Sequence, residues 1–207
     1  MADRLVVFGC GGHAKVVIEA VLARTPNREI VILDDDPATH GGSVLDIRVA
    51  GGRELLSGFR GSPVVLAVGS NNARSKVMQW LGEQGHELET VIHPAAFVGS
   101  TASIAEGVFV SAGAIAIAEA RIGRGAIINT AASVDHDCVV GDCAHIAPGV
   151  HLCGDVTIGA RTLVGTGSVV RPGTSVCDDV ILGAGAVVVR DITEPGTFVG
   201  NPARRLK

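Results

Sequence analysis

A strict six-residue period runs from Val98 to Val188 and limits the folds open to this chain more than any other feature. Every sixth residue in this stretch is apolar, and fifteen of the sixteen are Val, Ile or Leu: Val98, Ile104, Val110, Ala116, Ile122, Ile128, Val134, Val140, Ile146, Leu152, Ile158, Val164, Val170, Val176, Leu182 and Val188. The period fits neither the 3.6-residue repeat of a helix nor the two-residue alternation of one long strand. It is typical of a parallel β-helix, in which each hexapeptide supplies a short strand and a corner.

Three hexapeptides should close one triangular coil, so residues 18 positions apart are expected to stack on one another. A small or β-branched residue lies two places before each aliphatic one, as at Ala114 and Ala132. Both classes should point inward, because side chains alternate along a strand. Large and small side chains together fill a narrow prism, which agrees with an aromatic content of only 3%. A single coil cannot bury its apolar face alone, so stacked neighbours are expected to supply the stability.

The residues before this repeat alternate between short apolar strands and helical segments. Strands are expected at residues 4–8, 29–33, 64–68 and 88–92, and helices at residues 14–23 and 73–81. This order predicts a small, doubly wound, Rossmann-like α/β domain, whose ligands would bind beyond the carboxyl ends of the strands. We therefore expect an α/β domain over residues 1–92, a β-helix over residues 93–193 and a tail over residues 194–207.

A glycine-rich turn, Gly9-Cys10-Gly11-Gly12-His13-Ala14, follows the first expected strand. It matches the loose dinucleotide fingerprint, and Asp34 follows at about the distance of the acid that holds a ribose hydroxyl. The domain has room for only one half of the usual dinucleotide fold, which argues against a nicotinamide cofactor. We expect the turn to present backbone N–H groups to a phosphate; the alternative is a turn that only lets a helix pack on a strand.

Charge and cysteine content narrow the classes of partner. The net charge of −4 and the absence of a basic run make nucleic acid an unexpected partner. The first apolar run ends at Gly9, which is too short for a signal peptide or a membrane span, so no membrane insertion is expected. Five cysteines without a CxxC pair predict inert thiols in a cytoplasmic protein, and no metal site.

The segment Asp135-His136-Asp137 interrupts the small and aliphatic residues of the repeat. His136 falls on a corner, so its ring should face solvent or a neighbouring chain. Its stacked counterparts, Ala118 and Gly154, should leave a hollow around it. An imidazole between carboxylates in such a gap is suited to act as a general base, and an exposed histidine beside two acids is the alternative.

The outward positions that stack with His145 are mostly apolar: Phe109, Ile127, Leu163 and Ile181. Such a strip would be unusual on a monomer, so we expect another subunit to cover it. The strip also lies opposite the corner of His136 in the triangle. His136 could therefore meet Asn129 and His145 only of a neighbouring chain.

Several motifs together resemble one family: the hexapeptide repeat, the Gly-Gly-His turn, Asn129-Thr130, Asp135-His136-Asp137 and the tail segment Val199-Gly200-Asn201-Pro202-Ala203. The family comprises bacterial nucleotide-sugar acetyltransferases, such as those acting on UDP-linked bacillosamine precursors or GDP-perosamine, and sialic-acid O-acetyltransferases. The resemblance implies a left-handed β-helix and a homotrimer with active sites between subunits. It also implies acetyl-CoA as the donor and an N-terminal domain that holds the nucleotide-sugar.

The resemblance assigns roles position by position. His136 resembles the catalytic base, Asp137 the acid that raises its basicity, and Gly154 is placed to supply an oxyanion N–H. The positions that match acetyl-CoA contacts are His145, Thr166 and Ala184. Those that match the nucleotide-sugar site are Gly11, Gly12, His13, Asp34 and Asp35, with Asn129 expected beside them.

These features predict an acetyl-CoA-dependent N-acetyltransferase that acts on a nucleotide-linked amino sugar, most simply a 4-amino sugar. The amine would attack the thioester directly, with His136 as general base and no metal. The first alternative is O-acetylation of a sialic acid or another sugar hydroxyl. The second is a solenoid scaffold without catalytic activity.

Overall fold

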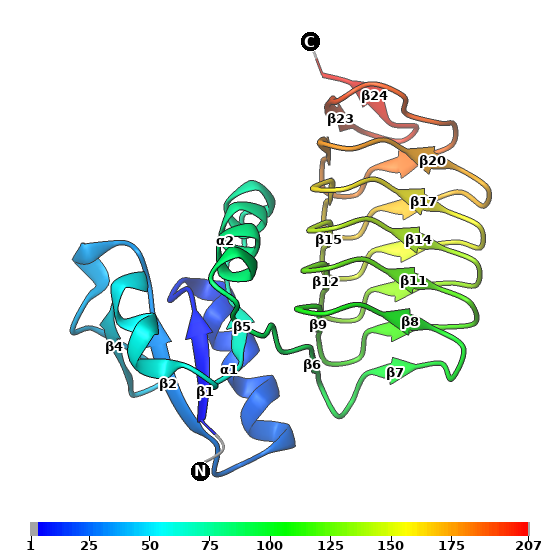
Figure 1. Cartoon of the computed structure of the whole chain (residues 1–207). Coiled ribbons are helices and arrows are strands. Elements are labelled where there is room, and N and C mark those ends of the chain that lie inside the picture. Colours follow the sequence, from blue (N-terminus) through cyan, green and yellow to red (C-terminus); the bar gives the residue numbers. More distant parts are fainter. Residues whose placement is uncertain (1–3, 207) are drawn as a thin grey trace.

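The computed structural model describes residues 4–206 and shows an α/β domain standing beside a β-helix (Figure 1). The α/β domain has a five-stranded sheet in the order β3-β4-β2-β1-β5. Its strands and helices are β1 (Arg4–Phe8), α1 (Gly12–Arg24), β2 (Glu29–Leu33), β3 (Ser43–Val44), β4 (Ile47–Gly51), β5 (Val64–Leu66) and α2 (Asn71–Glu83), with 3₁₀ turns at Pro37–Thr39 and Arg53–Phe59. All strand pairs are parallel except β3 with β4.

Burial on both faces explains the apolar run of β1. Its residues Leu5, Val6 and Val7 have no exposed surface, as is typical of a central parallel strand covered on both sides. β1 and β2 have the predicted bounds, whereas both helices begin earlier than the sequence suggested. The strands β3 and β4, at one side of the sheet, were not predicted, because half or more of their residues are at least partly exposed and carry a weak strand pattern.

Residues 88–92 do not form the last strand of the α/β sheet, contrary to the prediction. Leu88 makes only an isolated bridge with Val64. β6 (Val91–Ile92) instead pairs with β9 (Phe109–Val110) of the β-helix. Ile92 lies six residues before Val98, so the hexapeptide register already includes it, and β6 is the first strand of its face.

The β-helix has three faces built from short strands spaced 18 residues apart, except for β23 and β24 at the end of face 3. Face 1 contains β7 (Phe97–Val98), β10 (Ile115–Ala116), β13 (Ser133–Val134), β16 (His151–Leu152), β19 (Val169–Val170) and β22 (Val187–Val188). Face 2 contains β8 (Ser103–Ile104), β11 (Arg121–Ile122), β14 (Val139–Val140), β17 (Thr157–Ile158) and β20 (Ser175–Val176). Face 3 contains β6, β9, β12 (Ile127–Ile128), β15 (His145–Ile146), β18 (Leu163–Val164), β21 (Val180–Leu182), β23 (Gly196–Val199) and β24 (Arg204–Arg205).

The interior of the prism confirms the inward positions predicted from the repeat. Val110, Ile128 and Ile146 are fully buried, and so are the small residues Ala114 and Ala132. The corners of adjacent coils approach closely, which explains their glycines. At Gly141, for example, a Cβ would lie 2.6 Å from the backbone nitrogen of Ala160 in the next coil.

The α/β domain of the same chain covers the beginning of face 3, where we had expected another subunit. Phe109 and Ile127 are each 1% exposed and belong to one apolar cluster with Val17 and Val21 of α1. Farther along the face, Ile181 is still 48% exposed. The apolar strip therefore argues for a partner subunit only at its far end. Among residues 4–206, no helix is long and apolar enough to span a membrane.

Candidate active site

His136 and Asp137 form a hydrogen-bonded pair on the corner between faces 1 and 2. The Nδ1 of His136 lies 2.8 Å from Oδ2 of Asp137, and the backbone N–H of His136 donates to Asp135. The hydrogen bond to Asp137 is the main cause that raises the pKa of His136 above its usual value. Because Nδ1 carries the donated proton, Nε2 has a free lone pair and can accept a proton from a substrate.

Gly154 lies directly against the imidazole of His136. A Cβ at Gly154 would overlap Cε1 and Nε2 of the ring, so only glycine fits there. Backbone hydrogen bonds stack this corner on Ala118 in the previous coil and on Asp155 in the next. The imidazole therefore occupies the space that a side chain at position 154 would need. The side chains of His136 and Asp137 are 57% and 59% exposed, so the pair faces outward.

The glycine-rich turn forms a cavity of about 250 Å³ at the carboxyl ends of β1 and β5. A Cβ at Gly9, where φ is +113°, would lie 2.7 Å from the carbonyl oxygen of Ala67. A Cβ at Gly11 or Gly12 would meet nothing within 4 Å, so the N-terminus of α1 stays open to a ligand. The open backbone and the positive end of the helix dipole suit a phosphate group.

The two predicted acids of the nucleotide-sugar site have different surroundings. Asp34 lines the cavity and accepts hydrogen bonds from the backbone N–H groups of Cys10, at 2.8 Å, and Asp36, at 2.9 Å. It therefore shapes the glycine-rich turn itself. Asp35 instead pairs with Arg53, and the hydrogen bond from Arg53 is the main cause that lowers the pKa of Asp35. Asp35 is not among the residues that line the cavity.

Arg53 was not singled out in the sequence. Its guanidinium lies 4.5 Å from the ring centroid of Trp80 on α2, in a cation–π arrangement. This contact links the Asp35 pair to α2, and neither Arg53 nor Trp80 is among the residues that line the glycine-rich cavity. The sequence did not indicate that Asp35 and Arg53 form an ion pair. Their pairing depends on how β2 and the following turn lie in the sheet.

His13 and His145 meet where the α/β domain docks on face 3. The ring of His13 stands edge-on to Phe109 at 5.2 Å, and its centroid is 6.4 Å from that of His145. Asn129 Nδ2 lies 2.9 Å from Nε2 of His145, so this nitrogen accepts the hydrogen bond. The structure thus brings His13, a residue predicted to bind the nucleotide-sugar, close to Asn129 and His145 of the same chain.

Both histidines of this seam are neutral near pH 7. Burial is the main cause that lowers the pKa of His13 to about 4 and that of His145 to about 3, and the charge of Arg74 adds to the effect. Nε2 of His13 is buried, and no hydrogen-bond partner for it lies among residues 4–206. The seam is therefore a low-polarity environment whose imidazoles act as neutral donors and acceptors.

A second cavity of about 260 Å³ lies between the start of α2 and face 3. Its lining residues are Gly69, Ser70, Asn71, Asn72, His145, Arg161, Leu163, Asp179 and Ile181. Gly69 also lines the glycine-rich cavity, so the two cavities adjoin at this residue. A ligand held by the glycine-rich turn could therefore extend along face 3.

The remaining predicted donor contacts lie on the corner between faces 3 and 1. Thr166 and Ala184 are exposed there in successive coils, and Asn129 is on the same corner. His136 lies on a different corner, so one chain does not bring it to His145 or Thr166. That these residues meet across subunits stays a prediction.

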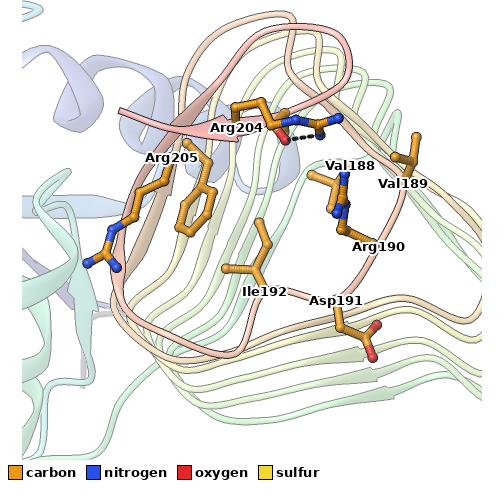
Figure 2. A pocket seen from close by; sticks show the side chains of 9 residues that line it. Val188, Val189, Arg190, Asp191, Ile192, Arg204 and Arg205 are labelled. Carbon is orange, nitrogen blue, oxygen red and sulfur yellow. Dashed lines mark hydrogen bonds between the residues drawn. The ribbon is translucent and has the colours of Figure 1, made fainter. Parts of the chain in front are cut away.

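A cavity of about 190 Å³ lies at the end of the β-helix. Ile192 points toward the tail there (Figure 2). Arg204 donates to its neighbouring backbone carbonyl at Ala203, and Arg205 donates to Glu194. Ile192 is 7% exposed and packs with the last coil of the core. These residues close the open end of the prism, and they include none of the predicted site residues.

Comparison with known proteins gave two family matches. Residues 4–81 match the PglD N-terminal domain, and residues 155–190 match the bacterial transferase hexapeptide family of six repeats. UDP-N-acetylbacillosamine N-acetyltransferase of Bacillus subtilis is 37% identical over 119 residues, which are 52% of this chain and 51% of that protein. The alignment thus spans about half the length of this curated relative.

Several solved structures resemble nearly the whole chain, among them the following two. The acetyltransferase domain of PglB from Neisseria gonorrhoeae in complex with acetyl coenzyme A is 41% identical, with a TM-score of 0.93 and all of both chains covered. PerB from Caulobacter crescentus in complex with CoA and GDP-perosamine is 39% identical, with a TM-score of 0.91 and 99% and 97% of the two chains covered. The predicted fold, a Rossmann-like domain followed by a left-handed hexapeptide β-helix, is confirmed.

Proposed function

Because the chain belongs to the nucleotide-sugar N-acetyltransferases that join a PglD N-terminal domain to a hexapeptide β-helix, we propose that it acetylates a nucleotide-linked amino sugar with acetyl-CoA. The observation that carries this proposal is the His136–Asp137 pair, whose free Nε2 projects over Gly154 from an exposed corner. A solenoid that serves only as a scaffold would have no need of a histidine with this tautomer and a raised pKa.

In the proposed reaction the sugar amine attacks the thioester carbonyl of acetyl-CoA. His136 Nε2 takes the proton that the amine loses, and Asp137 stabilises the imidazolium through the Nδ1 hydrogen bond. The carbonyl electrons move to oxygen, where a backbone N–H, for which Gly154 is the candidate, would stabilise the charge. When the carbonyl re-forms, the C–S bond breaks, and the CoA thiolate takes the proton back from the imidazolium.

The other site residues divide between the two substrates. The glycine-rich cavity, with Gly11, Gly12 and Asp34, would hold the nucleotide, and His13 would lie beside it. His145, Thr166 and Ala184 would contact acetyl-CoA. Asn129 holds His145 and would lie near the sugar. Asp35 would act only indirectly, because its ion pair with Arg53 shapes the loop.

We further infer a homotrimer with the site between subunits. The support is the separation of His136 from His145 and Thr166 on different corners, together with the exposed end of face 3 at Ile181. A second copy that packs along these corners would complete the surface that the outward-facing His136 needs. The cytoplasmic location expected from the sequence stays a prediction.

The acceptor group is proposed to be an amine. The Bacillus subtilis relative is named an N-acetyltransferase, and the Caulobacter crescentus structure contains GDP-perosamine, an amino sugar nucleotide. This favours nitrogen over the sialic-acid or other sugar hydroxyl that the sequence alone left open. The base, Asp137 and the oxyanion donor would serve either acceptor, so the assay compares amine and hydroxyl acceptors directly.

The test is a thiol-release assay with acetyl-CoA and a panel of UDP-, dTDP- and GDP-linked 4-amino sugars. Each amino sugar is paired with its 4-hydroxy counterpart on the same nucleotide. We expect CoA release with at least one amino sugar, and a product whose mass has increased by one acetyl group. Release only with the hydroxy sugars would make the protein an O-acetyltransferase, and no release above hydrolysis with any acceptor would contradict the proposal.

A further inference from the structure

Helix α2 presents three residues to the corner between faces 2 and 3 of the β-helix. Asn71, Arg74 and Met78 are spaced i, i+3 and i+7, so they share one side of the helix. Arg74 has no exposed surface, and Met78 packs against the sulfur of Cys143 at 3.9 Å. Figure 1 shows α2 standing alongside the β-helix in this position.

Arg74 and Asn71 bind the same backbone position in three successive coils. Arg74 Nε donates to the carbonyl of Gly125 at 2.8 Å, and its Nη2 donates to that of Cys143 at 2.7 Å. Asn71 Nδ2 donates to the carbonyl of Arg161 at 2.8 Å. Residues 125, 143 and 161 are spaced 18 apart, so the two side chains contact a ladder of equivalent carbonyls.

These carbonyls are available because the coil-to-coil hydrogen bonds use the preceding residue. The N–H of Cys143 donates to the carbonyl of Arg124, and the N–H of Arg161 donates to that of Asp142. The carbonyls one residue later point out of the ladder at the corner. Buried backbone carbonyls need donors, and α2 supplies them from its side chains.

The same guanidinium also holds the loop that separates the two cavities. Arg74 Nη1 donates to the carbonyls of Val68, at 2.9 Å, and Gly69, at 3.1 Å. Its Nη2 donates to Oδ1 of Asn71 at 2.9 Å. Val68 and Gly69 line the glycine-rich cavity, and Gly69 and Asn71 line the cavity on face 3. One side chain therefore joins the walls of both cavities to the β-helix.

A lysine could not make this set of bonds. The planar guanidinium carries five N–H donors in a fixed fork, whereas an ammonium group is a compact point charge with three. Burial lowers the pKa of Arg74 to about 10, which still leaves it protonated near pH 7. A buried cation without an acid partner is stable only if carbonyls satisfy its donors, as they do here.

We propose that Arg74, assisted by Asn71, is a positioning residue that sets the register of the α/β domain on the β-helix and so aligns the acceptor with the acetyl donor. The inference rests on the proposed function for its kinetic part. A β-helix repeats its corner every coil, about 4.8 Å apart, so apolar contact alone specifies this register weakly. Misplacing a reacting group by about 1 Å can cost roughly 100-fold in rate.

The experiment compares Arg74→Lys, Arg74→Met and Asn71→Ala with the wild type. Arg124→Met is the matched control, because Arg124 is an exposed arginine on the β-helix that pairs with Glu106. Hydrogen exchange of the backbone over residues 68–83 is measured first, without any ligand. Steady-state kinetics with the best amino sugar nucleotide then gives kcat and the KM of each substrate.

We expect faster exchange of residues 68–83 in Arg74→Lys, although it keeps the charge, and a smaller change in Asn71→Ala. Arg74→Lys should raise the acceptor KM and lower kcat by about tenfold or more, with the acetyl-CoA KM within about twofold of the wild type. Arg124→Met should match the wild type in both measurements. If Arg74→Met does not fold, the exchange and kinetic measurements on Arg74→Lys are sufficient to test the inference.

Wild-type exchange and unchanged acceptor kinetics in Arg74→Lys would overturn the inference. Equal loss of affinity for both substrates would also overturn it, because that result indicates a general structural role. If the wild type acetylates no amino sugar, the proposed function fails, and the exchange measurement alone decides whether Arg74 sets the register.

Discussion

The neutral histidines His13 and His145 predict that the protein loses stability when the pH falls below about 6.5. Their folded-state pKa values are about 4 and about 3, below the ordinary value of 6.5. Between these values the unfolded chain binds more protons than the folded one, so stability decreases as the pH decreases. His136, whose pKa is raised, acts in the opposite direction, but it is unchanged in the comparison below.

The size of the effect follows from the shifts. Each histidine should contribute about 1.4 kcal/mol of lost stability per pH unit in this window, or roughly 2–3 kcal/mol between about pH 7.5 and about pH 4.5. The pair should therefore cost about 5 kcal/mol in the free energy of unfolding, which is a large part of the stability of an ordinary domain. Asp35 and other acids with lowered pKa values lose their contribution mainly at still lower pH.

The assay is urea unfolding at several pH values, followed by the fluorescence of Trp80, the single tryptophan. The double variant His13→Gln with His145→Gln removes both titrating groups, and the amide introduced by His145→Gln keeps an oxygen that can accept from Asn129. His151→Gln, which replaces an exposed histidine on face 1, is the control.

We expect the double variant to lose much less stability between the two pH values than the wild type and the control, whatever its stability at pH 7.5. Equal losses in all three proteins would refute the reasoning. The two imidazoles would then not be held neutral by burial at the seam.

Three further predictions concern the reaction. His136→Ala should lower kcat by about 100- to 10,000-fold with little change in melting temperature, and near-wild-type kcat would contradict a general base. Asp137→Asn should move the rise of kcat with pH to lower pH, because it removes the main cause of the raised His136 pKa, and pH–rate profiles test this. Asp34→Asn should raise the KM of the nucleotide-sugar but not that of acetyl-CoA, as initial-rate kinetics would show, because Asp34 shapes only the glycine-rich turn. Sedimentation velocity should detect a trimer at assay concentrations, and an active monomer would rule out a shared site.

The β-helix could be predicted from the sequence because its rules are local and repeat. A residue's face and depth follow from its place in the hexapeptide, and its stacked neighbours follow from the 18-residue coil. The same rule would have found β6, since Ile92 lies one step before Val98. It was missed because the strand pattern before it was assigned to the α/β sheet.

The covering of face 3 could not be predicted in this way. A period says which side chains point outward, but it does not say what lies against them. Phe109 and Ile127 are buried by α1 of the same chain, so a partner subunit was the wrong explanation for them. Arg74 gave no signal for a related reason. In the sequence it is a polar residue on a short helix, and its burial depends on carbonyls 51 and 69 residues away.

The two halves of the proposed site differ in how much of their chemistry is fixed by the repeat. The corner of His136 is determined by its coil: Asp137 orients the ring, and Gly154 must be glycine because the next coil puts it against the imidazole. None of these residues touches the glycine-rich cavity, which lies in the other domain. Acceptor recognition could therefore change through the α/β domain without disturbing the base. What must be kept during such a change is the register between the two domains, and for that reason a buried contact such as that of Arg74 with the coil carbonyls is as relevant to the reaction as either cavity.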